Sequence, residues 1–390
     1  MNVKHHRGRT NLVSQERRQE GRVGALESGL GTTVLWKVYS NLVRGGAFPF
    51  HERNTSPMVR TFIALGLLSF VLGACELPRA HGDASAVIVG ADVELWEEVE
   101  ASFLDAMAPT IQTVREERPF RITHQDPLDL QYWNNLRRFR QVLVMGAADD
   151  PWVSEALERY DGELGEPPIL LQVHDVWAQG QQVSVLILPE SGQAEAVNEL
   201  AGVLQGILDQ QFRDYARTRM YVSGFNVELA DSLGVEFGFA LTFPNVYRVV
   251  EREDSFVRIR NDNPNPRELI REVGVTWVSP IPEELPDQSE LEEWRHEFAN
   301  ERYNDPQELD LSVTTYREID VNGYNGVEFQ SAWASPEGAW PAGGPFITRA
   351  IVCPERDRLY LMDAWVYAPE RDKYEYVIQL QNILNSFECR

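Results

Sequence analysis

Hydrophobic residues in the first half of the chain form short runs that alternate with helical stripes. Ala86 to Gly90 and Gln141 to Gly146 are apolar runs of a length typical of buried strands. Val93 to Met107 repeats apolar residues at helical spacing, and Asp92 stands before it as a helix cap. The longest helical pattern runs from Ser191 to about Arg219. This half is therefore predicted to contain strands covered by helices.

The second half changes to period-two alternation, which predicts strands. We expect strands over Ser255 to Arg260, Val273 to Ser279, Ser312 to Ile319, Gly326 to Trp333, Pro345 to Cys353 and Arg358 to Ala368. Ala342-Gly343-Gly344 is expected to turn the chain between two of them. A charged helix is predicted from Ser289 to Tyr303, and a closing helix from Arg371 to Phe387. A mostly antiparallel sheet covered by the closing helix is the expected architecture.

One further apolar run precedes these elements and ends at Cys75. Residues 58–74 have a basic start at Arg60, an uncharged run from Thr61 to Val71, and small residues before the cysteine. The run is shorter than the roughly 20 residues that a membrane-spanning helix needs, and it fits a secretory signal. The alternative is a buried apolar helix with an incidental cysteine.

The residues before Cys75 resemble the lipobox of bacterial lipoproteins. The resemblance implies cleavage before Cys75, a diacylglycerol on its sulfur, often a further acyl chain such as palmitate on the new amine, and hence a stable membrane anchor. Glu76 differs from the aspartate that resembles an inner-membrane retention signal, which favours the outer membrane, with the domain facing the periplasm or the cell surface.

Residues 1–57 are basic and stand before the predicted signal. We interpret them as the result of a start codon placed too early, and exclude them from the fold prediction. The alternative is a genuine basic arm that binds nucleic acid or lipid head groups. Residues 75–85 are polar and predict a tether.

The remaining residues predict an α+β protein of two domains, covering residues 86–222 and 223–390. About 316 residues after the signal suit two domains better than one. Each domain is expected to be a mostly antiparallel sheet covered by helices.

The net charge of the chain argues against nucleic-acid partners. Residues 1–74 hold 10 of the 36 Lys and Arg and 4 of the 60 Asp and Glu, so the rest of the chain carries a net charge near −30. Phosphate binding needs a basic surface, so we expect no nucleic-acid partner. Lys373 is the one lysine after Cys75, and an acidic surface with so little lysine suggests a salt-adapted host.

Several tracts resemble a known family. The longest is Gly343 to Phe387, with its GGPF and VYAP-x-x-DK-x-x-Y motifs, supported by Asp175 to Ile187 and Gly234 to Val250. Together with the lipobox they resemble Gram-negative lipoproteins that carry a domain of unknown function, DUF4837. The resemblance implies an exported, anchored domain and brings no known activity. The second half, through Phe243-Pro244-x-x-Tyr247 and its closing helix, also resembles the Mog1/PsbP-like α/β/α sandwich, whose members mostly bind proteins.

The sequence offers little catalytic chemistry. It has no G-x-S-x-G elbow, no phosphate-binding loop, and no pair of histidines at metal-ligand spacing after Cys75, so no metal or cofactor is expected. Cys353 and Cys389 are the two other cysteines. An oxidising periplasm would permit a disulfide between them, but two free thiols are favoured over the bridge.

Aromatic residues provide the candidate binding patch. Trp333, Trp340, Tyr360, Trp365 and Tyr367 are expected to gather around the Ala342-Gly343-Gly344-Pro345 loop. Tryptophan and tyrosine are favoured at interfaces, and aromatic faces also stack on sugars. The predicted binding patch consists of Trp333, Trp340, Gly343, Gly344, Phe346 and Trp365. The plainer alternative is that these rings pack beneath the closing helix.

We therefore predict a non-enzymatic lipoprotein that binds an envelope protein or glycan. The rival prediction is an envelope hydrolase or glycan-processing enzyme with a carboxylate-based site. A third alternative is a structural spacer without a specific ligand.

Overall fold

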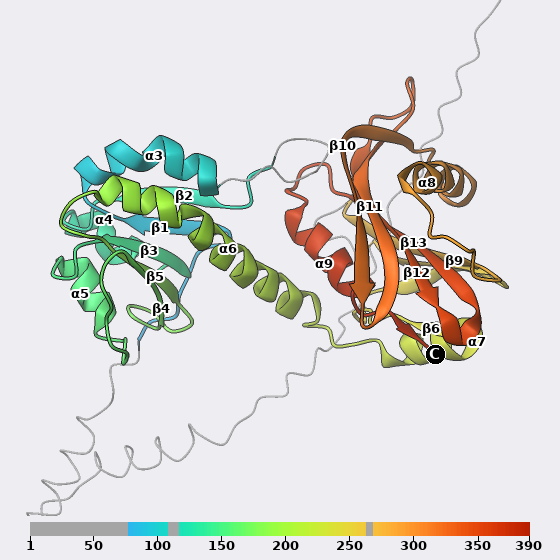
Figure 1. Cartoon of the computed structure of the whole chain (residues 1–390), viewed down its shortest axis with the longest axis horizontal. Coiled ribbons are helices and arrows are strands. Elements are labelled where there is room, and N and C mark those ends of the chain that lie inside the picture. Colours follow the sequence, from blue (N-terminus) through green and yellow to red (C-terminus); the bar gives the residue numbers. More distant parts are fainter. Residues whose placement is uncertain (1–76, 108–116, 263–267) are drawn as a thin grey trace, which may run out of the picture. The chain divides into compact units, whose positions relative to one another are not determined.

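The computed structural model describes residues 77–107, 117–262 and 268–390 (Figure 1). Residues 1–57, the predicted signal at 58–74 and Cys75 lie outside the described residues. Residues 76–390 form one compact unit that contains a five-stranded and a seven-stranded sheet. Within the predicted tether, Arg79 and His81 form parallel bridges to Gln179 and Phe139, so this part of it packs against the first half of the unit.

The first sheet has the strand order β2-β1-β3-β5-β4. Its strands are β1 (Ala86–Gly90), β2 (Arg121–Gln125), β3 (Gln141–Gly146), β4 (Ile169–His174) and β5 (Gln182–Ile187). Three of its four pairings, β1 with β2, β1 with β3 and β3 with β5, are parallel, and β4 with β5 is antiparallel. The prediction of a mostly antiparallel sheet is wrong for this half of the chain.

The physical reason lies in the connections. Parallel neighbours need a crossover, usually a helix, whereas antiparallel neighbours can be joined by a short turn. The chain alternates strand and helix until β4 and β5, which share the one short connection in this sheet. Strand β3 is buried at all six positions, as expected for a strand covered on both faces.

Helices cover both faces of the first sheet. They are α3 (Val93–Met107), α4 (Leu130–Leu136), α5 (Pro151–Leu157) and α6 (Gln193–Met220). The apolar stripes of α3 and α6 share one core with the sheet, and α4 and α5 contribute to the other. Asp92 caps α3 as predicted, because its carboxylate accepts a 2.8 Å hydrogen bond from the amide of Glu94.

The second sheet has the order β10-β11-β12-β13-β9-β8-β7, and every pairing in it is antiparallel. Its strands are β7 (Arg248–Glu253), β8 (Phe256–Asn261), β9 (Ile270–Val278), β10 (Glu308–Val321), β11 (Tyr324–Ala334), β12 (Gly343–Cys353) and β13 (Arg358–Tyr367). The antiparallel prediction is confirmed for this half. A separate two-stranded sheet pairs β6 (Phe239–Ala240) with β14 (Glu388–Cys389). In the sequence, β6 precedes the seven strands and β14 follows them.

Helices also cover both faces of the second sheet, which gives the predicted α/β/α sandwich. On one face, α7 (Val227–Phe237) and α9 (Tyr374–Leu384) share a core with the sheet. On the other, α8 (Gln288–Arg302) packs over a second, more aromatic core. In the described part of the chain, no helix is both long and apolar enough to cross a membrane.

Candidate functional site

The connection between β11 and β12 exposes Trp340. The amide of Ser335 donates to the carbonyl of Ala342 over 2.9 Å, which closes residues 335–342 into a loop. Gly338 supplies the left-handed backbone that the turn within the loop requires, with φ of +85°. Trp340 is 82% exposed, so it is not a core residue.

The two glycines expected to form the turn instead lie inside β12. Gly343 pairs with Ala334, and Gly344 pairs with Trp333. A Cβ added to Gly344 would lie 1.7 Å from the carbonyl oxygen of Val366, so this position accepts no side chain. The prediction of a turn at Ala342-Gly343-Gly344 is therefore wrong, because the glycine serves a close approach of neighbouring strands.

Beside the loop lies a cavity of about 210 Å³ with an aromatic wall. Its aromatic residues are Tyr303, Trp333, Trp340, Trp365 and Tyr367. The other lining residues are Arg260, Ile270, Asn304, Asp305, Pro306, Gln307, Ser335, Ala339 and Ala342. We call this the aromatic cavity. It is smaller than the pockets of about 300–1,000 Å³ that enclose drug-sized ligands, and it suits a single ring or side chain.

The rings in the wall contact one another at ordinary aromatic geometry. Trp333 and Trp365 are perpendicular, with ring centroids 5.4 Å apart, and Tyr303 lies 5.4 Å from Trp365. Both indoles are at least nine-tenths buried, yet neither Nε1–H has a hydrogen-bond partner among the described residues. A buried donor without a partner costs about 1–3 kcal/mol. An acceptor on a bound ligand would offer these donors what the described protein does not.

Buried polar groups hold the floor of the aromatic cavity in place. The Tyr303 hydroxyl donates to Asp363 Oδ2 over 2.6 Å, and Arg295 Nε donates to Asp363 Oδ1 over 3.0 Å. Arg295 also donates to Gln307 and lies 4.3 Å from the ring centre of Phe346. Burial, with Asp363 as a second cause, raises the pKa of Tyr303 well above its usual value, so the hydroxyl stays a donor.

The charged groups of the lining are one cation and one carboxylate. Arg260 pairs with buried Glu272, and Asp305 is the single acid in the lining. Hydrolysis by a carboxylate pair needs two acids across a cleft. The cavity can stack a ring and donate hydrogen bonds, and its lining lacks the second acid for that chemistry.

The structure brings together part of the predicted patch. Trp333, Trp340 and Trp365 line the aromatic cavity. Phe346 is buried beneath Arg295, and Gly343 and Gly344 are paired in β12. Those three residues lie behind the cavity wall and do not line the cavity.

Tyr360 does not belong to the patch. It is buried in the core on the α9 face, where its hydroxyl donates to the carbonyl of Phe237 over 2.7 Å. Successive residues of a strand point to opposite faces, so Tyr360 cannot share a face with Trp365 and Tyr367. The sequence prediction also missed Tyr303 and residues 304–307, which follow α8. No local pattern links that segment to Trp333.

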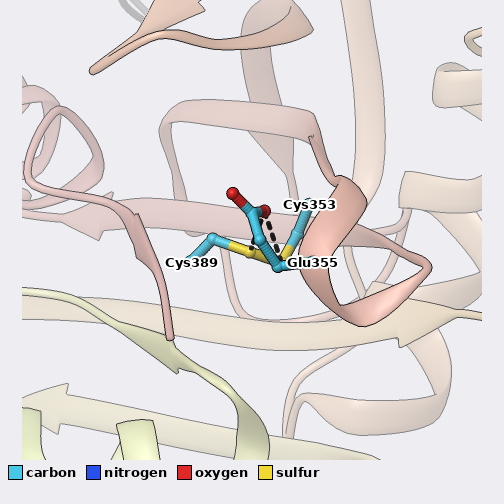
Figure 2. Close-up of side chains that lie close together, drawn as sticks. All are labelled: Cys353, Glu355 and Cys389. Carbon is cyan, nitrogen blue, oxygen red and sulfur yellow. Dashed lines mark hydrogen bonds between the residues drawn. A yellow bond between two sulfur atoms is a disulfide. The ribbon is translucent and has the colours of Figure 1, made fainter.

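The two cysteines lie apart from this cavity. Cys353 and Cys389 are joined by a disulfide with Cα atoms 5.7 Å apart, in place of the two free thiols that the sequence favoured. Figure 2 shows the Glu355 carboxylate beside both sulfurs, and its Oε2 lies 3.1 Å from Cys389 Sγ. Three potential metal ligands therefore meet here. The disulfide removes the thiolates that a metal would need.

Comparison with known proteins supports the DUF4837 part of the predicted resemblance, over the second half of the chain. Residues 226–386 match the family model described as a domain of unknown function, DUF4837. A search of curated proteins found no match to the chain.

Solved structures of several proteins align with 39% of this chain. The Ran-binding protein Mog1p of Saccharomyces cerevisiae is 10% identical, with 39% of this chain and 90% of that chain covered and a TM-score of 0.28. PsbP (CyanoP) of Synechocystis sp. PCC 6803 is 17% identical, with 39% and 87% covered and a TM-score of 0.27. A Bacteroides thetaiotaomicron protein is 8% identical, with 39% and 45% covered and a TM-score of 0.17. The α+β architecture itself rests on the sheets and helices described above.

Proposed function

We propose that the protein is a lipid-anchored, non-enzymatic binding module whose aromatic cavity holds a group of an envelope partner. One observation carries the proposal: Trp340 is 82% exposed at an aromatic cavity instead of packing in a core. An exposed tryptophan beside a pocket is typical of an interface hot spot. The small volume suits a side chain or sugar ring that protrudes from a larger partner.

The enzyme alternative has less support, because Asp305 is the one acid among the lining residues that the structure describes.

Co-purification from the native host tests the binding proposal. The full chain, its Trp340→Ala variant and a Val235→Ala control are compared after in-cell cross-linking. Val235 lies on α7 and is 91% exposed, so its variant truncates an equally exposed side chain elsewhere. The proposal requires an envelope protein or glycan that is recovered with the parent chain and the control and is lost with Trp340→Ala. Equal recovery with all three would contradict it.

The anchor is a separate part of the proposal and rests on the lipobox resemblance at Cys75. Cys75→Ala, expressed from Met58, should accumulate as a precursor without lipid. Metabolic labelling with an acyl analogue and the mass of the N-terminal peptide measure this. Normal cleavage and labelling of the variant would refute the anchor and leave the aromatic cavity untouched.

A further inference from the structure

A second cavity, of about 320 Å³, lies on the opposite face of the seven-stranded sheet. It shares no lining residue with the aromatic cavity. The change of face follows from strand alternation: Ile270 of β9 lines the aromatic cavity, and its neighbour Arg271 lines the second one. The lining comprises Arg219, Met220, Val222, Ser223, Pro244, Val246, Tyr247, Asn261, Leu269, Arg271, Glu375, Tyr376 and Gln379.

Arg271 lines this cavity and has no carboxylate partner among the described residues. No described acid lies within ion-pair distance of it. Its Nη1 donates to Gln379 Oε1 over 2.9 Å, and its buried Nε has no partner among the described residues. By contrast, the buried guanidinium groups of Arg258, Arg295 and Arg349 each pair with a buried carboxylate. Arg140 and Arg358 are also half-buried without a described carboxylate partner, so what distinguishes Arg271 is its place in the lining of a cavity.

Tyr247 adds a second polar group without a partner. It is 3% exposed and lines the cavity, and its hydroxyl bonds to no described residue. The other charged groups in the described lining are Arg219 of α6 and Glu375 of α9, whose Nε and Oε1 lie 3.7 Å apart. Among the lining residues that the structure describes, Arg219, Arg271 and Glu375 together give a charge of +1.

The remaining wall is apolar, and part of it is exposed. Met220 and Leu269 are buried in the core behind the cavity, whereas Val222 is 82% exposed and Val246 is 38% exposed. The cavity therefore offers a cation and an apolar surface side by side, with the Tyr247 hydroxyl buried directly behind its lining. A group with one negative charge would satisfy Arg271 and neutralise the lining, and an apolar tail would cover the valines.

We propose that this cavity binds a small amphiphilic carboxylate, with its head on Arg271 and Tyr247 and its apolar part against Val222 and Val246. The paired N–H groups of arginine match a carboxylate in a bidentate arrangement. The net charge of +1 fits a monoanion better than a dianionic phosphate. This site is independent of the binding function proposed for the aromatic cavity.

Calorimetric titration of the full chain with decanoate tests the proposal. Decanol has the tail without the charge, acetate has the charge without the tail, and decyl phosphate has the alternative head. Saturable one-to-one binding of decanoate is expected, at least about tenfold tighter than the other three, because a charge-assisted hydrogen bond is worth roughly twice a neutral one. Equal binding of decanol, tighter binding of decyl phosphate, or no saturable binding of decanoate would each overturn it.

Three variants locate the site. Arg271→Gln should weaken decanoate binding by about tenfold or more, and Tyr247→Phe by about threefold to tenfold. Arg248→Gln, an arginine of the same sheet that pairs with Asp262 at the surface, should change it by less than about twofold. Tyr247→Phe also keeps the test sound if Arg271→Gln does not fold, because losing a hydroxyl without a partner should leave the thermal midpoint equal or higher. An unchanged affinity in Tyr247→Phe would exclude this cavity.

Discussion

At the residue scale, one set of buried polar side chains forms a hydrogen-bonded network beneath the aromatic cavity. Asp363 is fully buried and accepts hydrogen bonds from Arg295, Tyr303 and Thr348. Such groups hold the aromatic cavity from below without facing a ligand. Replacing one of these groups should therefore change the free energy of unfolding more than the affinity for a ligand.

Replacing Asp363 by asparagine should destabilise the fold strongly. The change keeps the shape of the side chain but leaves Arg295 as a buried cation without its counter-charge. Removing one partner of a buried ion pair costs about 3–5 kcal/mol. Urea unfolding measures the free energy, with the exposed Asp254→Asn as the control, which should change it by less than about 0.5 kcal/mol. A similar loss of unfolding free energy in both variants would show that the Asp363 network stabilises the fold no more than a surface acid does.

Tyr247 should make the fold sensitive to alkali. Burial raises its pKa to about 12, from about 10 in the unfolded chain. The folded state therefore holds this proton more tightly, so the stabilisation is complete below pH 10 and is lost as the pH rises towards 12. The loss should reach about 2–3 kcal/mol in the parent chain. Tyr247→Phe should show a correspondingly shallower decline between pH 10 and 12, and parallel curves would contradict the assignment.

The residue scale also shows what the sequence could and could not predict about the site. Strand alternation alone separates Tyr360 from Trp365, so that error was avoidable. Tyr303 and Gln307 were not predictable, because they enter the wall from a segment about 30 residues before Trp333. A contact of that range depends on the packing of α8 over the sheet and leaves no local pattern.

At the element scale, long periodic segments were predicted well. Strand β1 and helix α3 have their predicted bounds, and α8 differs by one residue at each end. Strand β7 was missed because it is an edge strand whose exposed positions are charged. The parallel sheet was missed because the direction of a strand is set by its connections. The residues of one strand do not show whether it pairs with its neighbours in a parallel or an antiparallel direction.

Two glycine substitutions should have opposite effects on their elements. Gly202 lies on an exposed position inside α6, where an added Cβ meets nothing within 4 Å. Gly202→Ala should stabilise the protein by about 0.5–1 kcal/mol through helix propensity. Gly344→Ala should destabilise it by more than about 3 kcal/mol, because the methyl group would collide with the carbonyl of Val366. Chemical unfolding of both variants measures this, and a Gly344→Ala variant as stable as the parent would refute the close strand approach.

At the scale of the whole molecule, charge dominates. The chain carries a net charge of −24, because its 60 Asp and Glu outnumber its 36 Lys and Arg. Self-repulsion between exposed carboxylates should weaken the compact state in dilute salt.

Salt should therefore raise the thermal midpoint. One molar sodium chloride shortens the screening length from about 10 Å at 0.1 M to about 3 Å, which removes most of the repulsion between surface acids. We expect a midpoint several degrees higher in molar than in dilute salt, measured by scanning calorimetry. Identical midpoints would remove the case for a salt-adapted protein.

The aromatic cavity is the central claim at this scale, and photo-crosslinking from position 339 tests it most directly. A photoreactive phenylalanine analogue replaces Ala339, an exposed residue of the lining, in one variant of the full chain and Val235 in another, so that Trp340 stays in place. Both variants are irradiated in the native host. The account predicts a specific adduct from position 339, mapped by mass spectrometry to one envelope component, and none from position 235. Absence of an adduct at 339, or the same adducts from both positions, would contradict a binding role for the cavity.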